Sequence, residues 1–165
     1  MIRSFRKAGA LGAAAVAAVT FAAAAPASAA ASGDGLEFTL YSKEVPGEGD
    51  GQGDQAPQVG DSFAFADDLY RTKGGDKVGR DGVTCTVVRA GDPGDMMCVG
   101  TFALTGGPGG QLAGQNLVSF DPSDEAPAAF DIAVTGGTGD FKDVRGWIRS
   151  TPDGDYSRLE FHLSR

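Results

Sequence analysis

The sequence predicts an all-β domain made of short antiparallel strands. Turn signals rich in Gly, Asp and Pro recur about every 10 to 15 residues from Gly60 onward. The segments between them are rich in β-branched and aromatic residues, and several alternate between apolar and polar side chains. After residue 29, no long window shows the apolar period of an amphipathic helix. These patterns favour strands over helices throughout the folded part of the chain.

Eight segments are expected to form strands, and a turn signal separates each from the next. The last one alternates most clearly, since Leu159, Phe161 and Leu163 share one face and polar residues lie between them. The glycine-rich runs at 105–110 and 135–140 fit sharp reversals between strands. The expected strands are 36–41, 61–70, 77–89, 95–105, 110–119, 127–135, 142–151 and 155–164.

Residues 1–29 are expected to be a signal peptide. This segment has three basic residues near its start, an Ala-rich apolar stretch at 8–25, and the small-residue cleavage site Ala27-Ser28-Ala29. A retained membrane-spanning helix is the alternative, but an Ala-rich stretch is only weakly apolar and a cleavage site follows it directly. We therefore expect a secreted, extracellular protein.

A single domain, residues 36–165, is expected after that segment. Residues 30–58 hold the first strand and a flexible Gly/Asp-rich loop, and 59–165 hold the rest of the domain. The whole chain has 14 basic and 22 acidic residues, a net charge of −8. The signal segment contains three of the basic residues and no acid, so removing it leaves 11 against 22, or −11. No Lys/Arg cluster remains, and neither nucleic acid nor an anionic membrane surface is an expected partner.

The two cysteines, Cys85 and Cys98, are expected to form a disulfide. Each lies in an expected strand, and the turn at 90–94 places them opposite each other. A disulfide suits an oxidising compartment, in agreement with export. A catalytic thiol is the alternative, but the single histidine, His162, is distant in the sequence. One histidine cannot build an ordinary zinc site, so no metal is expected.

Eight antiparallel strands can form either a sandwich or a closed barrel, and composition leaves both open. Three segments resemble plant dirigent proteins and the related allene oxide cyclase-like barrels. Residues 67–70 (Asp-Asp-Leu-Tyr) are similar to a dirigent Asp-Asp-Pro-Leu-Thr stretch, without its proline. Residues 78–82 are similar to Val-Gly-Arg-Ala-Gln-Gly, and 136–146 to Gly-Gly-Thr-Gly-x-Phe-x-x-Ala-Arg-Gly. The chain is also similar to exported bacterial proteins with an allene oxide cyclase-like barrel.

The resemblance implies an eight-stranded antiparallel β-barrel with a central cavity, often in dimers or trimers. It also implies a small apolar or phenolic ligand and no cofactor. Dirigent proteins steer the coupling of phenoxy radicals, and allene oxide cyclases steer the ring closure of a fatty-acid epoxide. The leading hypothesis is thus a barrel that binds such a molecule and steers its cyclisation or coupling, as a cyclase, an isomerase or a dirigent protein does. The alternatives are a lipocalin-like carrier, and an extracellular structural protein whose interior is filled by its own side chains.

The resemblance also supplies candidate catalytic residues. Asp67, Asp68 and Asp140 would lie near the cavity mouth, where a carboxylate can exchange a proton with a phenol or a quinone methide. The alternative is an Asp that satisfies backbone N–H groups in a turn. Arg145 and Arg80 would hold a carboxylate or an oxyanion, Arg145 as a catalytic residue and Arg80 as a ligand-binding one. Their alternative role is a bridge to a neighbouring Asp that holds two strands in register.

Aromatic residues complete the prediction. Tyr70 and Tyr156 are candidate ligand-binding residues, with core or rim positions as the alternative. His162, on the polar face of the last strand, is expected at the surface. Phe141 and Trp147 are expected in the core.

Overall fold

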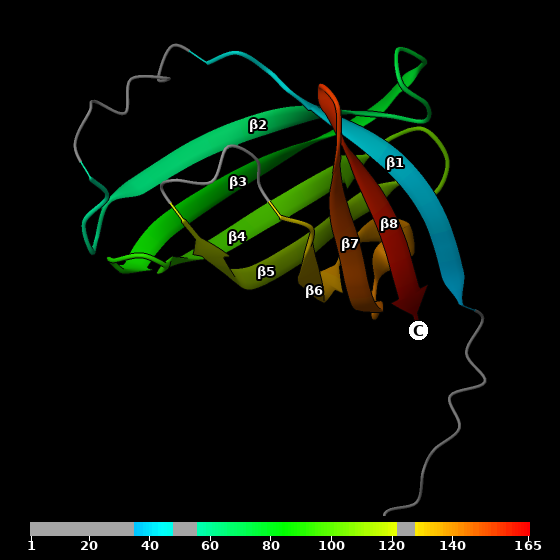
Figure 1. Ribbon diagram of the computed structural model, residues 1–165. Helices are drawn as coiled ribbons and strands as arrows, with labels where there is room; N and C mark the ends of the chain where they lie inside the picture. The colour runs from blue at the N-terminus through cyan, green and yellow to red at the C-terminus, as the bar shows by residue number, and fades with distance from the viewer. Residues whose placement is uncertain (1–34, 48–55, 122–127) are drawn as a thin grey trace, which may run out of the picture. The chain divides into compact units, whose positions relative to one another are not determined.

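The computed structural model describes residues 35–47, 56–121 and 128–165. Within them, eight antiparallel strands follow one another around a closed barrel, and the last pairs with the first (Figure 1). The strands are β1 (Leu36–Glu44), β2 (Ser62–Tyr70), β3 (Lys77–Arg89), β4 (Gly94–Leu104), β5 (Gly110–Phe120), β6 (Phe130–Gly137), β7 (Arg145–Asp153) and β8 (Tyr156–Ser164). The predicted all-β class and the barrel are confirmed, and the sandwich is excluded because each strand has two paired neighbours.

The expected start of β7 differs from the observed one. Residues 142–144 were expected to be extended, but a 3₁₀ turn, η1 (Gly139–Phe141), leads into an irregular link there. Asp143 in this link has a φ of 64°, which an extended strand does not allow. The expected signal peptide, 1–29, and much of the Gly/Asp-rich loop, 48–55, lie outside the described residues.

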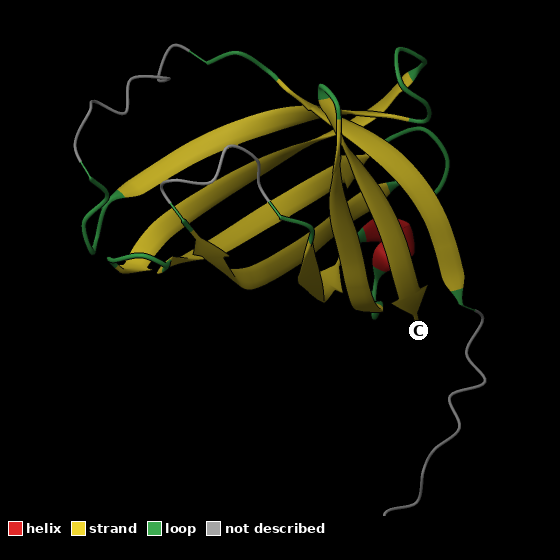
Figure 2. Cartoon of the chain, in the orientation of Figure 1, coloured by secondary structure: helices red, strands yellow, loops and turns green. Residues whose placement is uncertain are grey.

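One end of the barrel is filled by a packed core. Phe161 is central to it, since its ring stacks on Phe38 with centroids 4.3 Å apart and meets the Phe102 ring edge-on at 5.8 Å. The η1 turn lies at this end, close to the C-terminus (Figure 2), and buries Phe141 completely, as expected. The buried core residues are Leu40, Leu69, Val78, Phe102, Leu104, Leu112, Val134, Phe141, Val144, Ile148, Leu159, Phe161 and Leu163.

The segment 136–146, which carries the most specific part of the family resemblance, builds the corner at this filled end. A side chain at Gly137 would place its Cβ 2.6 Å from the backbone oxygen of Phe141, and Gly139 has a φ of 61°. The Asp140 carboxylate accepts a hydrogen bond from the backbone N–H of Gly109 at 2.8 Å. These contacts tie the β4–β5 and β6–β7 connections together.

The predicted disulfide is confirmed. Cys85 on β3 and Cys98 on β4 are directly paired in the sheet register, and both are buried. Their side chains face the barrel interior, because they share inward positions with Val87 and Phe102. The staple therefore fixes the β3–β4 register from inside the barrel.

Trp147 is not in the core, and that prediction is wrong. Strand alternation turns Ile148 inward, so Trp147 beside it points outward and remains 42% exposed. Its ring stacks on the His162 ring of β8, with centroids 4.0 Å apart. His162 Nδ1 also lies 3.3 Å from a carboxylate oxygen of Glu37, so this histidine is on the outer face as expected.

Candidate functional site

The other end of the barrel encloses a cavity of about 580 Å³. That volume lies within the range of small-molecule sites, roughly 300 to 1,000 Å³. The cavity and the packed core meet at Phe102, Ile132 and Leu159, which form its floor. Gly100 and Gly114, paired across β4 and β5, also line it and leave that part of the wall without side chains. Apolar residues of the wall above the floor are Phe65, Val83, Val99, Val118 and Phe130.

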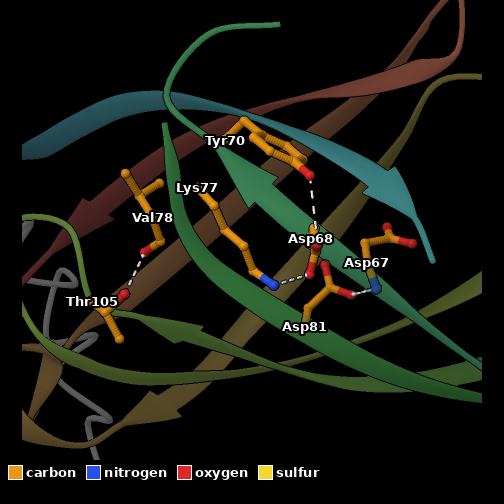
Figure 3. Close-up of polar contacts among 7 residues, drawn as sticks. All are labelled: Asp67, Asp68, Tyr70, Lys77, Val78, Asp81 and Thr105. Atoms are coloured by element: carbon orange, nitrogen blue, oxygen red, sulfur yellow. Dashed lines mark hydrogen bonds and ion pairs between the residues drawn. The ribbon is translucent and has the colours of Figure 1, made fainter. Parts of the chain in front are cut away.

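A row of three carboxylates crosses the cavity wall from β1 to β3. Glu44 is paired with Asp67 in the β1–β2 register, and Asp67 is paired with Asp81 in the β2–β3 register. All three line the cavity, from exposed Glu44 through half-buried Asp67 to Asp81, which is only 6% exposed. The Asp81 carboxylate accepts a hydrogen bond from the Asp67 backbone N–H at 3.2 Å (Figure 3). Buried Ser42 on β1 lines the same wall.

The environment of these acids raises two pKa values. Burial, with a contribution from the neighbouring Asp67 charge, raises the pKa of Asp81 to about 7, against the opposing effect of the Asp67 N–H hydrogen bond. Burial also raises the pKa of Asp67, and the charges of Glu44 and Asp68 act in the same direction. A hydrogen bond donated by the Ser42 hydroxyl opposes that rise. Asp81 can therefore both give and accept a proton near neutral pH, as a general acid–base residue must.

Among the predicted site residues, Asp67 and Tyr156 line the cavity. Asp68, the next residue after Asp67, points to the opposite face of β2, where it is ion-paired with Lys77 (Figure 3). The Tyr70 hydroxyl donates a hydrogen bond to Asp68 at 3.5 Å on that same face. The Tyr70 ring also meets the Tyr156 ring edge-on, with centroids 6.1 Å apart. Tyr70 thus supports a residue of the cavity rim from outside.

The other three predicted residues are not part of the cavity lining. Asp140 is in the η1 corner at the filled end, with its carboxylate on the Gly109 N–H. Arg145 is exposed at the start of β7, and its guanidinium donates to the backbone oxygen of Val144 at 3.2 Å. Arg80 is exposed on the face of β3 opposite to Asp81.

Sequence reasoning missed Asp81, although a signal for it was present. In the expected strand 77–89, Asp81 has the same parity as Val83, Cys85 and Val87, so the alternation places one acid on an apolar, inward face. Glu44 was missed because it follows the expected end of the first strand at 41.

The described parts of the chain contain no group of three or more His, Cys, Asp or Glu side chains arranged to hold a metal ion. They also contain no helix that is long and apolar enough to span a membrane.

The fold and the cavity define a small dirigent-like barrel with one hollow end. No protein-family model and no curated protein matches the sequence. Among solved structures, the chain is similar to pyocyanin demethylase, with 26% identity and a TM-score of 0.63 over 78% of this chain and 100% of that one. It is also similar to the pterocarpan synthase dirigent proteins PsPTS1, at 21% identity and TM-score 0.53, and GePTS1, at 20% and 0.51. These two matches cover 78% of this chain and 91% and 81% of the respective matched chains. The dirigent-like resemblance is thereby confirmed at the level of the fold.

Proposed function

We propose that the barrel binds one small, largely apolar or phenolic molecule in its cavity, and that the Asp67–Asp81 pair moves a proton during the cyclisation or isomerisation of that molecule. The observation that carries this proposal is a buried carboxyl group aimed into a ligand-sized cavity with mainly apolar walls. The names of the matched proteins, a pyocyanin demethylase and two pterocarpan synthases, refer to small organic molecules and support a ligand of that size.

Ring closure of a phenol onto a quinone methide illustrates the chemistry that this pair can support. The phenol oxygen forms a bond to the methide carbon, and its proton passes to one carboxylate. The other carboxyl group delivers a proton to the quinone oxygen, which becomes a phenol. Atoms and electrons balance within the molecule, so the step needs no co-reactant. The cavity walls hold the reacting groups together and exclude water.

The hydrophobic floor and the acidic wall together favour this function over its alternatives. A barrel filled by its own side chains has no cavity, so the 580 Å³ space argues against that structural role. A carrier of apolar molecules needs an almost entirely apolar cavity, whereas this cavity also contains Glu44, Asp67, Asp81 and Asp155. Burying ionisable groups costs folding free energy, and such groups are typical of sites that carry out acid–base chemistry.

The test begins with native mass spectrometry of the protein from its own host, followed by solvent extraction of any bound compound. The extracted compound and its chemical precursors are then incubated with the wild-type protein and with three variants. Asp81→Asn and Asp67→Asn should lower the conversion rate by about 100-fold or more, the usual contribution of a general acid or base. Asp68→Asn, one residue along and on the outer face, should convert at the wild-type rate. Equal conversion by all four proteins would contradict the acid–base role, and conversion no faster than in the absence of protein would leave only a carrier.

Export, with cleavage after Ala29, is part of the same proposal. The Cys85–Cys98 disulfide supports an oxidising compartment. N-terminal sequencing of the protein from the culture medium should start at Ala30. The expected dimer or trimer stays a prediction. The same native mass spectra report whether the protein is a monomer, a dimer or a trimer.

A further inference from the structure

The charged groups of the cavity are all of one sign. Its lining contains four carboxyl side chains, those of Glu44, Asp67, Asp81 and Asp155. No lysine, arginine or histidine is among the described residues that line it. The remaining polar groups of the wall are uncharged hydroxyl, amide and phenol groups. A ligand in this cavity therefore meets negative charge without a basic side chain to offset it.

Two lysines, on β1 and β3, have partners outside the cavity. Lys77 is ion-paired with Asp68 on the outer face of β2. Lys43 lies next to Glu44 in the sequence, but strand alternation turns it to the outer face, where its Nζ is 5.3 Å from the centroid of the Tyr156 ring. A carboxylate ligand would find neither of them inside the cavity, and like charges in a low-dielectric site repel strongly.

Aromatic side chains line the same cavity as the acids. The rings of Phe65, Phe102 and Phe130 line the cavity. The faces of aromatic rings attract cations, and flat ligands stack on them. Acids together with aromatic rings form a site that is complementary to a flat molecule with a delocalised positive charge.

We infer that the cavity selects a small aromatic cation and rejects aromatic and fatty carboxylates. The inference rests on the proposed function, since it names the charge class of the ligand for the same cavity. It excludes a fatty acid as the ligand of this barrel, although the cavity is large enough for one. It also gives the Asp67–Asp81 pair a second role, as the counter-charge that holds the ligand close to the proton-transfer groups.

Three probes of nearly equal shape test this inference: N-methylacridinium, its neutral isostere 9-methylanthracene, and anthracene-9-carboxylate. Binding of each to the full protein is followed by fluorescence at pH 8. We expect the cation to bind at least about tenfold more tightly than the neutral probe, and the anion more weakly than either. The double variant Asp67→Asn/Asp81→Asn should lose this advantage of the cation and keep its affinity for the neutral probe. Retained neutral binding shows that the variant is folded, and Asp68→Asn is the matched control on the outer face.

A pH series gives an independent readout. The groups that face Asp81 are Asp67 from β2 and Glu44 beyond it on β1, while its β4 partner is the uncharged Phe102. Burial raises the pKa of Asp81 to about 7, so below that pH a bound cation must displace a proton from it. The affinity for N-methylacridinium should therefore rise from pH 6 to pH 8, whereas the affinity for 9-methylanthracene should stay constant.

The outcomes separate the two proposals. Tight binding of the cation, lost in the double variant, supports both. Equal or tighter binding of the neutral or anionic probe overturns the charge selectivity but leaves a functional cavity. Failure of all three probes to bind overturns the cation inference together with the ligand-binding function on which it rests.

Discussion

Replacing Asp81 by asparagine should change how the stability of the barrel depends on pH. The folded-state pKa of Asp81, about 7, lies above its ordinary value of 3.8, so between these values the folded protein holds a proton that the unfolded chain has released. The free energy of unfolding is then highest at low pH, falls as the pH rises through this window, and levels off above pH 7. The amide introduced by Asp81→Asn has no charge at any pH, and its oxygen can still accept the Asp67 N–H hydrogen bond.

The size of the effect follows from the width of the window. One extra bound proton changes the free energy of unfolding by about 1.4 kcal/mol per pH unit. Between pH 5 and pH 7 the wild-type protein should thus lose roughly 2 kcal/mol through Asp81, or about 6 to 8 °C in Tm for a domain of this size, because the difference in bound protons shrinks as the pH approaches 7. Asp67, whose pKa burial also raises, adds to the loss in the same direction. At pH 8 the Asp81→Asn variant should be more stable than the wild-type protein by about 3 to 4 kcal/mol.

The assay is urea denaturation of both proteins at pH 5, 6, 7 and 8, with Asp76→Asn as a control at an exposed residue of the β2–β3 connection. The other ionisable groups are shared, so the difference between the two pH profiles isolates Asp81 and its coupling to Asp67. Parallel profiles for wild type and Asp81→Asn would refute the reasoning, because they would show that Asp81 titrates alike in the folded and unfolded states.

Three further predictions concern the staple, the cavity and the core. The double variant Cys85→Ala/Cys98→Ala should lose about 3 kcal/mol of stability in urea denaturation, as expected for a loop closed over a sequence separation of 13 residues. Val118→Trp should fill the hollow end and abolish binding of the extracted ligand in native mass spectra, while the Tm stays within about 3 °C of wild type; the neighbouring outward variant Leu117→Trp should bind normally. Phe161→Ala should cost about 3 to 5 kcal/mol, because it removes a ring that is 1% exposed and contacts two other rings. A loss below about 1 kcal/mol for this last variant would show that the core had collapsed around the gap.

The sequence pattern was sufficient to predict the strands because alternation and turns are local properties. The glycine-rich reversals and the inward stripe of Leu159, Phe161 and Leu163 are visible without any knowledge of distant contacts. Closure of the barrel was not visible in this way, because it depends on β1 meeting β8 across the whole chain. Only the family resemblance predicted it.

The candidate site was harder to predict from the sequence because the residues of the family motif and the acids of the cavity lie in different parts of the barrel. The run 136–146 carries the resemblance, yet its Gly137 and Asp140 build a corner at the filled end, and neither residue lines the cavity. The acids that line the cavity are brought together by the register of β1, β2 and β3, which no short motif records. The inward parity of Asp81 was the one local clue.

The division of the barrel into a packed end and a hollow end has a consequence for how such a protein can change. The apolar core residues and the cavity-lining residues form two sets, which share only the floor residues Phe102, Ile132 and Leu159. Apart from buried Asp81 and Cys98, wall residues above the floor should therefore accept substitutions that alter ligand binding with little change in the folding free energy. Single substitutions at the partly exposed wall positions should change which ligand binds. Randomising these positions should still yield folded protein.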